Sequence, residues 1–125
     1  MARLRDPDQG CPWDLEQSLD SLKSYLLEES HELIDAIDEL GPAAKQTSSP
    51  APASAAAIAN HREELGDVLL QIVFQSQLAE EFGWFTLEDV AQGIVDKMLR
   101  RHPHVFSDQP GALNSQEVVA QWQAI

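Results

Sequence analysis

Two short stretches of the chain, residues 26–34 and residues 63–70, carry acidic side chains at helical spacing inside otherwise apolar sequence. The four acids that share this spacing are Glu29, Glu32, Glu64 and Asp67. Side chains three or four residues apart lie on the same face of a helix, so each stretch offers one pair of carboxylates. Carboxylate oxygens are the hard ligands that Mg²⁺ prefers, usually together with water and substrate phosphates. The spacing therefore predicts a divalent-cation site built from two helices.

Glu29 and Asp67 also lie on helix stripes that should be apolar. Glu29 fills the gap between Leu26 and Leu33, and Asp67 begins a stripe that continues at Phe74. A buried ionised carboxylate is costly unless it is paired or binds a metal. The alternative is a solvated acidic helix face, which is common in acidic chains and suits the other acids of both helices better than these two.

Glu28 and His31 form a Glu-x-x-His pair, which raises the alternative of a di-iron carboxylate bundle. That class needs such a pair on two helices, and the second stretch offers Glu-x-x-Asp instead. Mg²⁺ is therefore the expected cofactor, with Mn²⁺ as a substitute.

Three of the eight lysines and arginines, Lys97, Arg100 and Arg101, lie within five positions of one another. Cations in the last turn of a helix offset its dipole, which is one interpretation of this group. The other is phosphate binding, since Lys97 and Arg101 are four residues apart and can hold one polyphosphate together. His102 and His104 follow and could assist, although loop histidines are commonly plain surface residues.

Two tryptophans are candidates for stacking on a nucleobase. Trp13 lies in the proline- and glycine-containing arm of residues 1–14, and Trp122 lies close to the C-terminal end of the sequence. An aromatic ring buries a large apolar area wherever it packs, so core packing is the alternative for each, and it is the one we favour from the sequence.

The composition limits the class of protein. A chain of 125 residues with 43% hydrophobic residues fits one folded domain, and 21 acids against 8 bases give a net charge of −13. That balance argues against nucleic-acid binding, which needs clustered basic residues, and an acidic enzyme acting on phosphates needs cations as intermediaries. We expect no signal peptide and no membrane span. Cys11 is the single cysteine, so we expect a reducing cytoplasm and no catalytic thiol.

The first two expected helices carry the four acids. The pattern predicts a helix over residues 15–40, broken near Ser18, where Ser18 or Asp20 could cap a second start. The dipeptide Gly41–Pro42 should end it. Residues 41–57 are rich in Ala, Pro and Ser and predict a flexible surface loop between the metal-binding helices.

The second helix should begin near Asn60, capped by Asn60 with Glu63, and end at Glu81, with Gly83 as the stop signal. Its middle, residues 68–74, is apolar on nearly every side. A helix of that kind must be covered on every side. One chain with four short helices cannot easily do so, and we therefore expect a homodimer or a higher homo-oligomer.

A third helix should begin at Thr86, with Asp89 completing the cap, and end at residue 101. Residues 102–114 predict a loop, and Asn114 or Ser115 should cap a short final helix. The expected fold class is all-α, a helical bundle.

The acidic motifs and several other segments of the sequence resemble those of a known family. The run Glu28-Glu29-Ser30-His31-Glu32, followed after a spacer by Glu64-Leu65-Gly66-Asp67, resembles the EExxE…ExxD signature of the MazG family of nucleoside triphosphate pyrophosphohydrolases, within the all-α NTP pyrophosphohydrolase superfamily. Further segments that look like this family are residues 4–7, 10–14, 64–71 and 96–106. The resemblance covers nearly the whole chain.

The resemblance implies Mg²⁺-dependent hydrolysis of nucleoside triphosphates between the α- and β-phosphates, giving a nucleoside monophosphate and pyrophosphate. By motif position it implies four metal ligands, Glu29, Glu32, Glu64 and Asp67. Glu28 would bind metal or accept a proton from water, Lys97 and Arg101 would bind the triphosphate, and Trp122 would lie near the nucleotide. The alternative is a degenerate, non-catalytic module that binds a nucleotide or a protein.

The family's architecture is a four-helix core that dimerises through intertwined helices. Many members carry two copies of the domain, and this sequence has one, which looks most like the first copy. The segment at residues 41–57 lengthens the connection between the two metal-binding helices. It could alter access to the site without changing the ligands.

Overall fold

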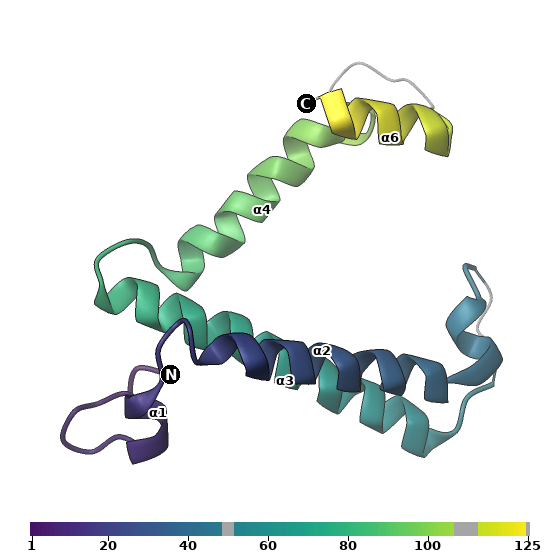
Figure 1. The fold of residues 1–125 in the computed structure, drawn as a ribbon. Coiled ribbons are helices and arrows are strands. Elements are labelled where there is room, and N and C mark those ends of the chain that lie inside the picture. The colour runs from purple at the N-terminus through teal and green to yellow at the C-terminus, as the bar shows by residue number, and fades with distance from the viewer. Residues whose placement is uncertain (49–51, 107–112, 125) are drawn as a thin grey trace. The chain divides into compact units, whose positions relative to one another are not determined.

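The computed structural model describes residues 1–48, 52–106 and 113–124, and these residues form helices, turns and irregular segments without any strand (Figure 1). The all-α prediction is confirmed. The chain divides into two compact units, Met1–Trp84 and Phe85–Ile125. In chain order the elements are α1 (Pro12–Glu16), α2 (Leu22–Glu39), the 3₁₀ helix η1 (Gly41–Lys45), α3 (Ala55–Glu81), α4 (Leu87–Arg101), α5 (Pro103–Phe106) and α6 (Ser115–Ala124).

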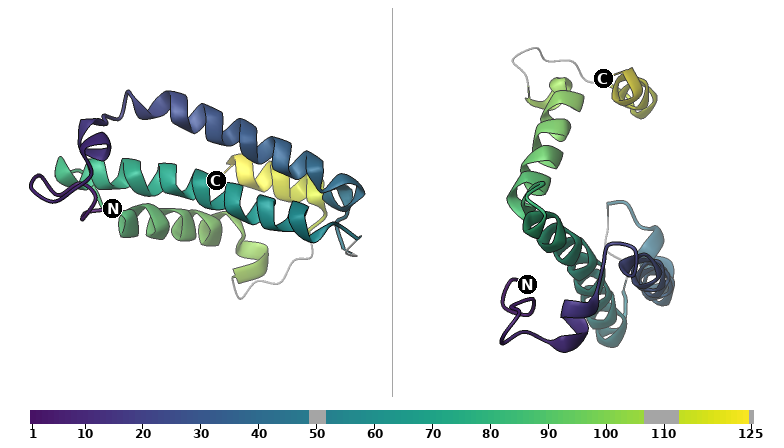
Figure 2. Two further views of the ribbon diagram at one scale, coloured as in Figure 1. Left: turned by 90° about the horizontal axis from the view of Figure 1, so that it is seen from below. Right: turned by 60° about the vertical axis from the view of Figure 1, so that its left-hand side comes forward.

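Helices α2 and α3 form an antiparallel pair in the first unit, lying side by side in each view (Figures 1 and 2). At one end, Leu22 of α2 packs against Phe74 and Leu78 of α3, and each of these three side chains is at most 2% exposed. At the other end, the Asn60 amide donates to the Glu39 carboxylate at 3.1 Å. This register places the middle of α2, with its acids, beside the middle of α3.

The predicted loop at residues 41–57 is shorter than expected. Gly41 ends α2 with a positive φ of 62°, which glycine adopts without steric cost, but the chain then forms η1 before it leaves the helix end. Helix α3 begins at Ala55 and not near Asn60, because Ser54 caps it by accepting from the Ala57 amide at 3.0 Å. Alanine has the highest helix propensity, so the Ala-rich run extends the helix. Residues 49–51 lie outside the described part.

The N-terminal arm folds back on the α2–α3 pair. The predicted break near Ser18 is confirmed, because α1 ends at Glu16 and the Ser18 hydroxyl accepts from the Ser21 amide at 3.0 Å before α2 begins. Arg5 holds the arm to the end of α3 with two hydrogen bonds to the Glu81 carboxylate, at 3.0 Å from Nε and 2.7 Å from Nη2. The Arg5 side chain also donates to the carbonyl oxygen of Asp14 at 2.6 Å.

The Glu81→Gln variant should lower the free energy of unfolding at neutral pH by about 0.5 kcal/mol, because a partly exposed ion pair is screened by solvent. The hydrogen bonds from Arg5 lower the pKa of Glu81. A group with a lowered folded-state pKa stabilises the fold above its unfolded pKa, and this contribution disappears as the pH falls through the folded-state value. Urea unfolding at pH 7 and pH 3 measures the effect.

At pH 3 the Glu81→Gln variant and the unchanged chain should therefore differ less than at pH 7. The Lys23→Met variant is a control, since it removes an ion pair with Asp20 in which both side chains are more than three-quarters exposed. Equal destabilisation by Glu81→Gln at both pH values would contradict a role for the charge of Glu81.

The second unit begins with a well-capped helix. Thr86 accepts from the Asp89 amide at 3.2 Å, and the Asp89 carboxylate accepts from the Thr86 amide at 2.9 Å, as predicted. Part of the predicted loop at residues 102–114 is instead the single turn α5, since Pro103 is favoured at a helix start. Asn114 provides the expected cap of α6 by accepting from the Glu117 amide at 2.9 Å.

Helix α3 carries several exposed large apolar side chains. Its large apolar side chains that are at least 43% exposed are Ile58, Leu65, Leu69, Leu70 and Ile72. The expectation that a second copy of the chain covers this helix stays a prediction. No helix in the described part of the chain has the length and apolar character that a membrane span requires.

Candidate functional site

Helices α2 and α3 bring the four predicted acids together. Glu29 and Glu32 project from the middle of α2, and Glu64 and Asp67 project from the facing part of α3. One carboxylate oxygen from each residue lies within 4.8 Å of those from the other three. The antiparallel register of the two helices thus converts two separate i, i+3 pairs into one cluster.

The cluster is only partly open to solvent. Glu29, Glu64 and Asp67 are half-buried, and Glu32 is exposed. One oxygen of Glu29 and one of Glu64 are shielded from solvent and have no hydrogen-bond partner. A shielded acceptor without a partner destabilises a fold unless something fills that role. A cation would satisfy both oxygens at once.

The electrostatics of the cluster also favour a bound cation. Partial burial raises the pKa of Glu29, and the nearby carboxylates of Glu32 and Asp67 raise it further. The pKa of Glu64 is raised for the same reasons, with burial first and then Glu32 and Asp67. Four like charges in a half-buried site repel one another, and a divalent cation reverses the sign of that interaction.

The donor set fits a hard divalent cation. Two oxygens on opposite sides of one Mg²⁺ lie about 4.2 Å apart, because each Mg–O distance is about 2.1 Å. The 4.8 Å limit of the cluster is close to that value, so small side-chain movements suffice. Because all four members of the group are carboxylates, the site suits Mg²⁺ or Mn²⁺ better than zinc. His31 is exposed and is not a member of the group, which counts against the di-iron alternative.

Glu28 does not join the cluster. Its side chain is exposed, and it is not among the four acids whose oxygens come together. It contributes only the last of the causes that raise the pKa of Glu29. A role for Glu28 in accepting a proton from water therefore stays a prediction.

Gln71 was missed by the sequence reasoning. This α3 residue is 8% exposed, and its amide oxygen is buried without a hydrogen-bond partner. It lies four residues after Asp67, on the same helix face. That spacing was the available signal, but we described residues 68–74 from the sequence as apolar on nearly every side and assigned no role to Gln71.

Trp13 packs on one side and is open on the other. Its ring lies edge-on to Tyr25 at 5.4 Å and to the buried Phe74 at 6.4 Å between ring centroids, yet Trp13 remains 47% exposed. The packing expected from the sequence is therefore present. Tyr25 lies one helical turn before Glu29, so this aromatic group begins one turn from the acidic cluster. Base stacking on Trp13 stays a prediction.

In the second unit, two of the predicted cations meet the second tryptophan. Lys97 Nζ lies 5.7 Å from the centre of the Trp122 ring, and the Arg101 guanidinium carbon lies 4.8 Å from it. The His102 ring meets the edge of Trp122 at 5.4 Å and donates from Nδ1 to the Met98 carbonyl oxygen at 2.8 Å.

Arg100 is exposed and does not take part in these ring contacts. The three basic residues predicted as one group are therefore divided, with Lys97 and Arg101 on Trp122 and Arg100 apart from it. All three lie in the last turns of α4, so compensation of the helix dipole also applies to them.

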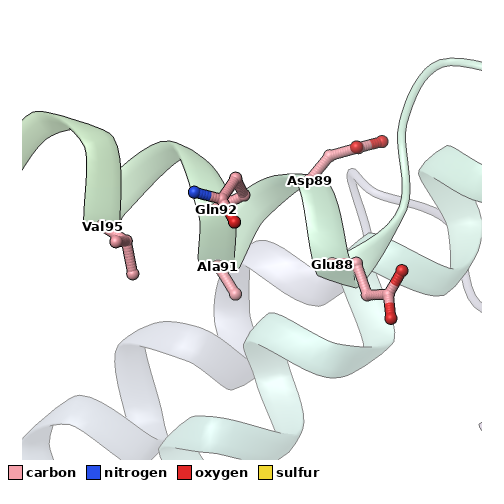
Figure 3. A pocket seen from close by; sticks show the side chains of 5 residues that line it. All are labelled: Glu88, Asp89, Ala91, Gln92 and Val95. Atoms are coloured by element: carbon pink, nitrogen blue, oxygen red, sulfur yellow. The ribbon is translucent and has the colours of Figure 1, made fainter.

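One helix, α4, also lines a surface pocket. Figure 3 shows Glu88, Ala91 and Val95 projecting from one side of this helix, and Asp89 and Gln92 complete the lining of a hollow of about 530 Å³. All five residues belong to α4, and none of them is a member of the acidic cluster or one of the predicted cations Lys97, Arg100 and Arg101. It carries no functional argument.

The family comparison covers α4 and the two helices of the acidic cluster, α2 and α3. Residues 17–106 match the family described as the MazG nucleotide pyrophosphohydrolase domain. The matched segment contains the four clustered acids together with Lys97 and Arg101, but it ends before α6. The role of Trp122 therefore receives no support from this match.

The sequence is similar to part of several longer proteins. The nucleoside triphosphate pyrophosphohydrolase of Escherichia coli K12 is 44% identical over 130 residues, covering 100% of this chain and 41% of that protein. The nucleoside triphosphate pyrophosphohydrolase/pyrophosphatase MazG of Thermotoga maritima is 49% identical over 111 residues, covering 89% of this chain and 37% of that protein. The chain thus spans about two fifths of the length of these relatives.

A solved structure agrees in fold. The crystal structure of a mazG-related protein from Thermotoga maritima has a TM-score of 0.67 and 24% sequence identity, and the match covers 98% of this chain and 89% of that chain. At this identity the likeness concerns the fold alone. The resemblance that the motifs indicated is confirmed by the match over residues 17–106. The chain belongs to the MazG nucleotide pyrophosphohydrolase family.

Proposed function

We propose that this chain hydrolyses nucleoside triphosphates between the α- and β-phosphates, releasing a nucleoside monophosphate and pyrophosphate. The observation that carries the proposal is the acidic cluster, in which one carboxylate oxygen from each of four residues lies within 4.8 Å of the other three. Two of these residues, Glu29 and Glu64, also have a shielded oxygen without a hydrogen-bond partner. Relatives over this region are named nucleoside triphosphate pyrophosphohydrolases, which supports the same reaction here.

The proposed cofactor is Mg²⁺, with Mn²⁺ as a substitute, held by Glu29, Glu32, Glu64 and Asp67. When bound there, the cation would supply Lewis-acid polarisation of the phosphates and would favour ionisation of the attacking water. The four carboxylates fix the position of this charge on two packed helices. A cation held there would also give an acidic protein a means to bind an anionic substrate.

The remaining proposed roles concern Glu28, two cations of α4 and Trp13. Glu28 is exposed next to Glu29 and is the candidate to accept the proton of the attacking water. Lys97 and Arg101 would hold the polyphosphate and stabilise charge on the departing pyrophosphate, because positioning and electrostatics dominate phosphoryl transfer. Trp13 is the candidate surface for the nucleobase.

Product analysis tests the proposal. The purified chain is incubated with ribo- and deoxyribonucleoside triphosphates and Mg²⁺, and the products are separated by ion-exchange chromatography. We expect equal amounts of nucleoside monophosphate and pyrophosphate, and no turnover in excess chelator. Release of a diphosphate and orthophosphate would contradict the site of cleavage. Nucleotide binding without turnover would instead support the non-catalytic module.

We also infer that a second copy of the chain covers the exposed apolar surface of α3. The Leu69→Asp variant should therefore lower the mass measured by light scattering to that of one chain, because Leu69 is 57% exposed and a charge there would be buried at the interface. The control is Leu4→Asp, a similarly exposed leucine in the N-terminal arm, which should keep the mass of the unchanged chain. A monomeric mass for the unchanged chain would contradict the inference.

A further inference from the structure

Trp122 brings together two cations that would otherwise repel each other. Lys97 and Arg101 lie four residues apart on α4, and both charged groups lie over the Trp122 ring of α6, at 5.7 Å and 4.8 Å from its centre. The face of an indole ring carries partial negative charge and attracts cations. The contact therefore fixes two flexible side chains at the end of α4.

An aromatic partner holds a cation without neutralising it. Among the described residues the two recorded salt bridges use Arg5 and Lys23, and neither Lys97 nor Arg101 forms one, although the chain has 21 acids. A carboxylate in place of Trp122 would position these side chains equally well, but it would cancel their charge toward an incoming anion. The indole leaves that charge available.

Donor capacity is also left unused in this group. Arg101 Nε is shielded from solvent and has no hydrogen-bond partner, and the same is true of His104 Nδ1. The His102 ring contacts two other rings of this group, with its centroid 5.5 Å from that of His104 and 5.4 Å from that of Trp122. A shielded guanidinium nitrogen without an acceptor is poised to take an anionic one.

We propose that Trp122 is a positioning residue, which holds Lys97 and Arg101 for the polyphosphate and acts on the substrate through these cations, not through the nucleobase. This proposal rests on the proposed function only in taking a triphosphate as the ligand. It differs from the expectation drawn from the family resemblance, in which Trp122 lies near the nucleotide. The ring area under the two cations is not available for stacking on a base.

Binding of inorganic tripolyphosphate tests this proposal, because that ligand has the phosphates but no base. The dissociation constant is measured by calorimetry on the full chain in Mg²⁺, for the unchanged protein and for Trp122→Leu and Trp122→Phe. Leucine keeps apolar volume but has no ring charge, so Trp122→Leu should weaken binding by about 5- to 30-fold, the range typical of one or two cation–π contacts. Trp122→Phe keeps a ring and should weaken it by less than about 3-fold.

The loss should be the same for tripolyphosphate, ATP and CTP if Trp122 acts through the cations. A loss confined to the two nucleotides would show base stacking and overturn the proposal, as would unchanged binding of tripolyphosphate by Trp122→Leu. Failure of the unchanged chain to bind tripolyphosphate would overturn it too. The proposed function can fail independently of this proposal. In that case the chain would release no pyrophosphate from nucleoside triphosphates, but its binding of tripolyphosphate would still depend on Trp122.

A double-mutant comparison separates positioning from loss of folding. In a chain that already carries Lys97→Ala and Arg101→Ala, the Trp122→Leu change should have no further effect on tripolyphosphate binding. The same additional loss in that background would mean that Trp122 acts without these cations, and would overturn the proposal. Thermal unfolding of each variant, followed by circular dichroism, shows which of them remain folded, and Trp122→Phe supplies the comparison if Trp122→Leu unfolds.

Discussion

The Asp67→Asn variant should lower the rate of pyrophosphate release by more than about 100-fold, since removing even a residue that only hydrogen-bonds to a metal ligand commonly lowers metal affinity or activity by about 10- to 100-fold. Asp67 is one of four acids whose oxygens lie within 4.8 Å of one another, and Asn is a neutral, weaker ligand of similar shape. The turnover number in saturating Mg²⁺, measured by coupled detection of pyrophosphate, gives the result.

The control for this variant is Asp38→Asn, which makes the same change in charge at an exposed position of α2 outside the cluster. It should retain the activity of the unchanged chain. In chelator, the Asp67→Asn variant should also melt at a higher temperature than the unchanged chain, because it removes one of four repelling charges. Activity close to normal in Asp67→Asn, or an equal loss in both variants, would refute the assignment of the site.

The Arg101→Ala variant should weaken the affinity for nucleoside triphosphate by about 10- to 100-fold, the range expected for hydrogen bonds to charged groups worth about 1.5 to 3 kcal/mol. Arg101 lies over Trp122 and has a shielded Nε without a partner, so its charge and donors are available to an anion. Calorimetric titration with a non-hydrolysable triphosphate analogue in Mg²⁺ measures the affinity.

The neighbouring Arg100→Ala variant provides a matched comparison. It removes the same charge from the same turn of α4, but Arg100 is exposed and lies outside the Trp122 group. Its effect should be clearly smaller than that of Arg101→Ala, and raising the salt concentration should reduce it further, since exposed charges are screened. Equal losses in the two variants would mean that net charge matters and the geometry of the group does not.

The parts of the fold that depend on local sequence were predictable. The cap formed by Thr86 and Asp89, the break near Ser18 and the stop at Gly83 follow from hydrogen bonds and backbone angles within a few residues. The four acids could be predicted to share a site because each pair is set by helical spacing within one segment. Their convergence then needed only that the two helices pack side by side.

Features that depend on contacts between distant segments were not predictable in the same way. Gln71 was treated as part of an apolar run, and only the packing of α3 shows that its amide oxygen is buried without a partner. The separation of Arg100 from Lys97 and Arg101 depends on where α6 places Trp122, which no spacing rule provides. The start of α3 at Ala55 was missed because the alanines beside prolines predicted a flexible surface loop, although Ser54 caps them as a helix.

The physical argument and the family membership contribute different parts of the account. Spacing, burial and unpartnered oxygens indicate a cation at Glu29, Glu32, Glu64 and Asp67, without naming a substrate. Membership of the MazG nucleotide pyrophosphohydrolase family is what supports the proposal of a nucleoside triphosphate as the substrate. The predicted activity loss of Asp67→Asn links the two, because it concerns the reaction and the metal ligand together.

Binding of Mn²⁺ tests the central claim most directly, because it concerns the four carboxylates and needs no substrate. Free Mn²⁺ is followed by electron paramagnetic resonance as it is added to the metal-free chain, to Asp67→Asn and to Asp38→Asn. We predict saturable binding by the unchanged chain and by Asp38→Asn, at one or two ions per chain, and binding weakened by at least about 10-fold in Asp67→Asn. Equal Mn²⁺ affinity in all three proteins would contradict the metal site.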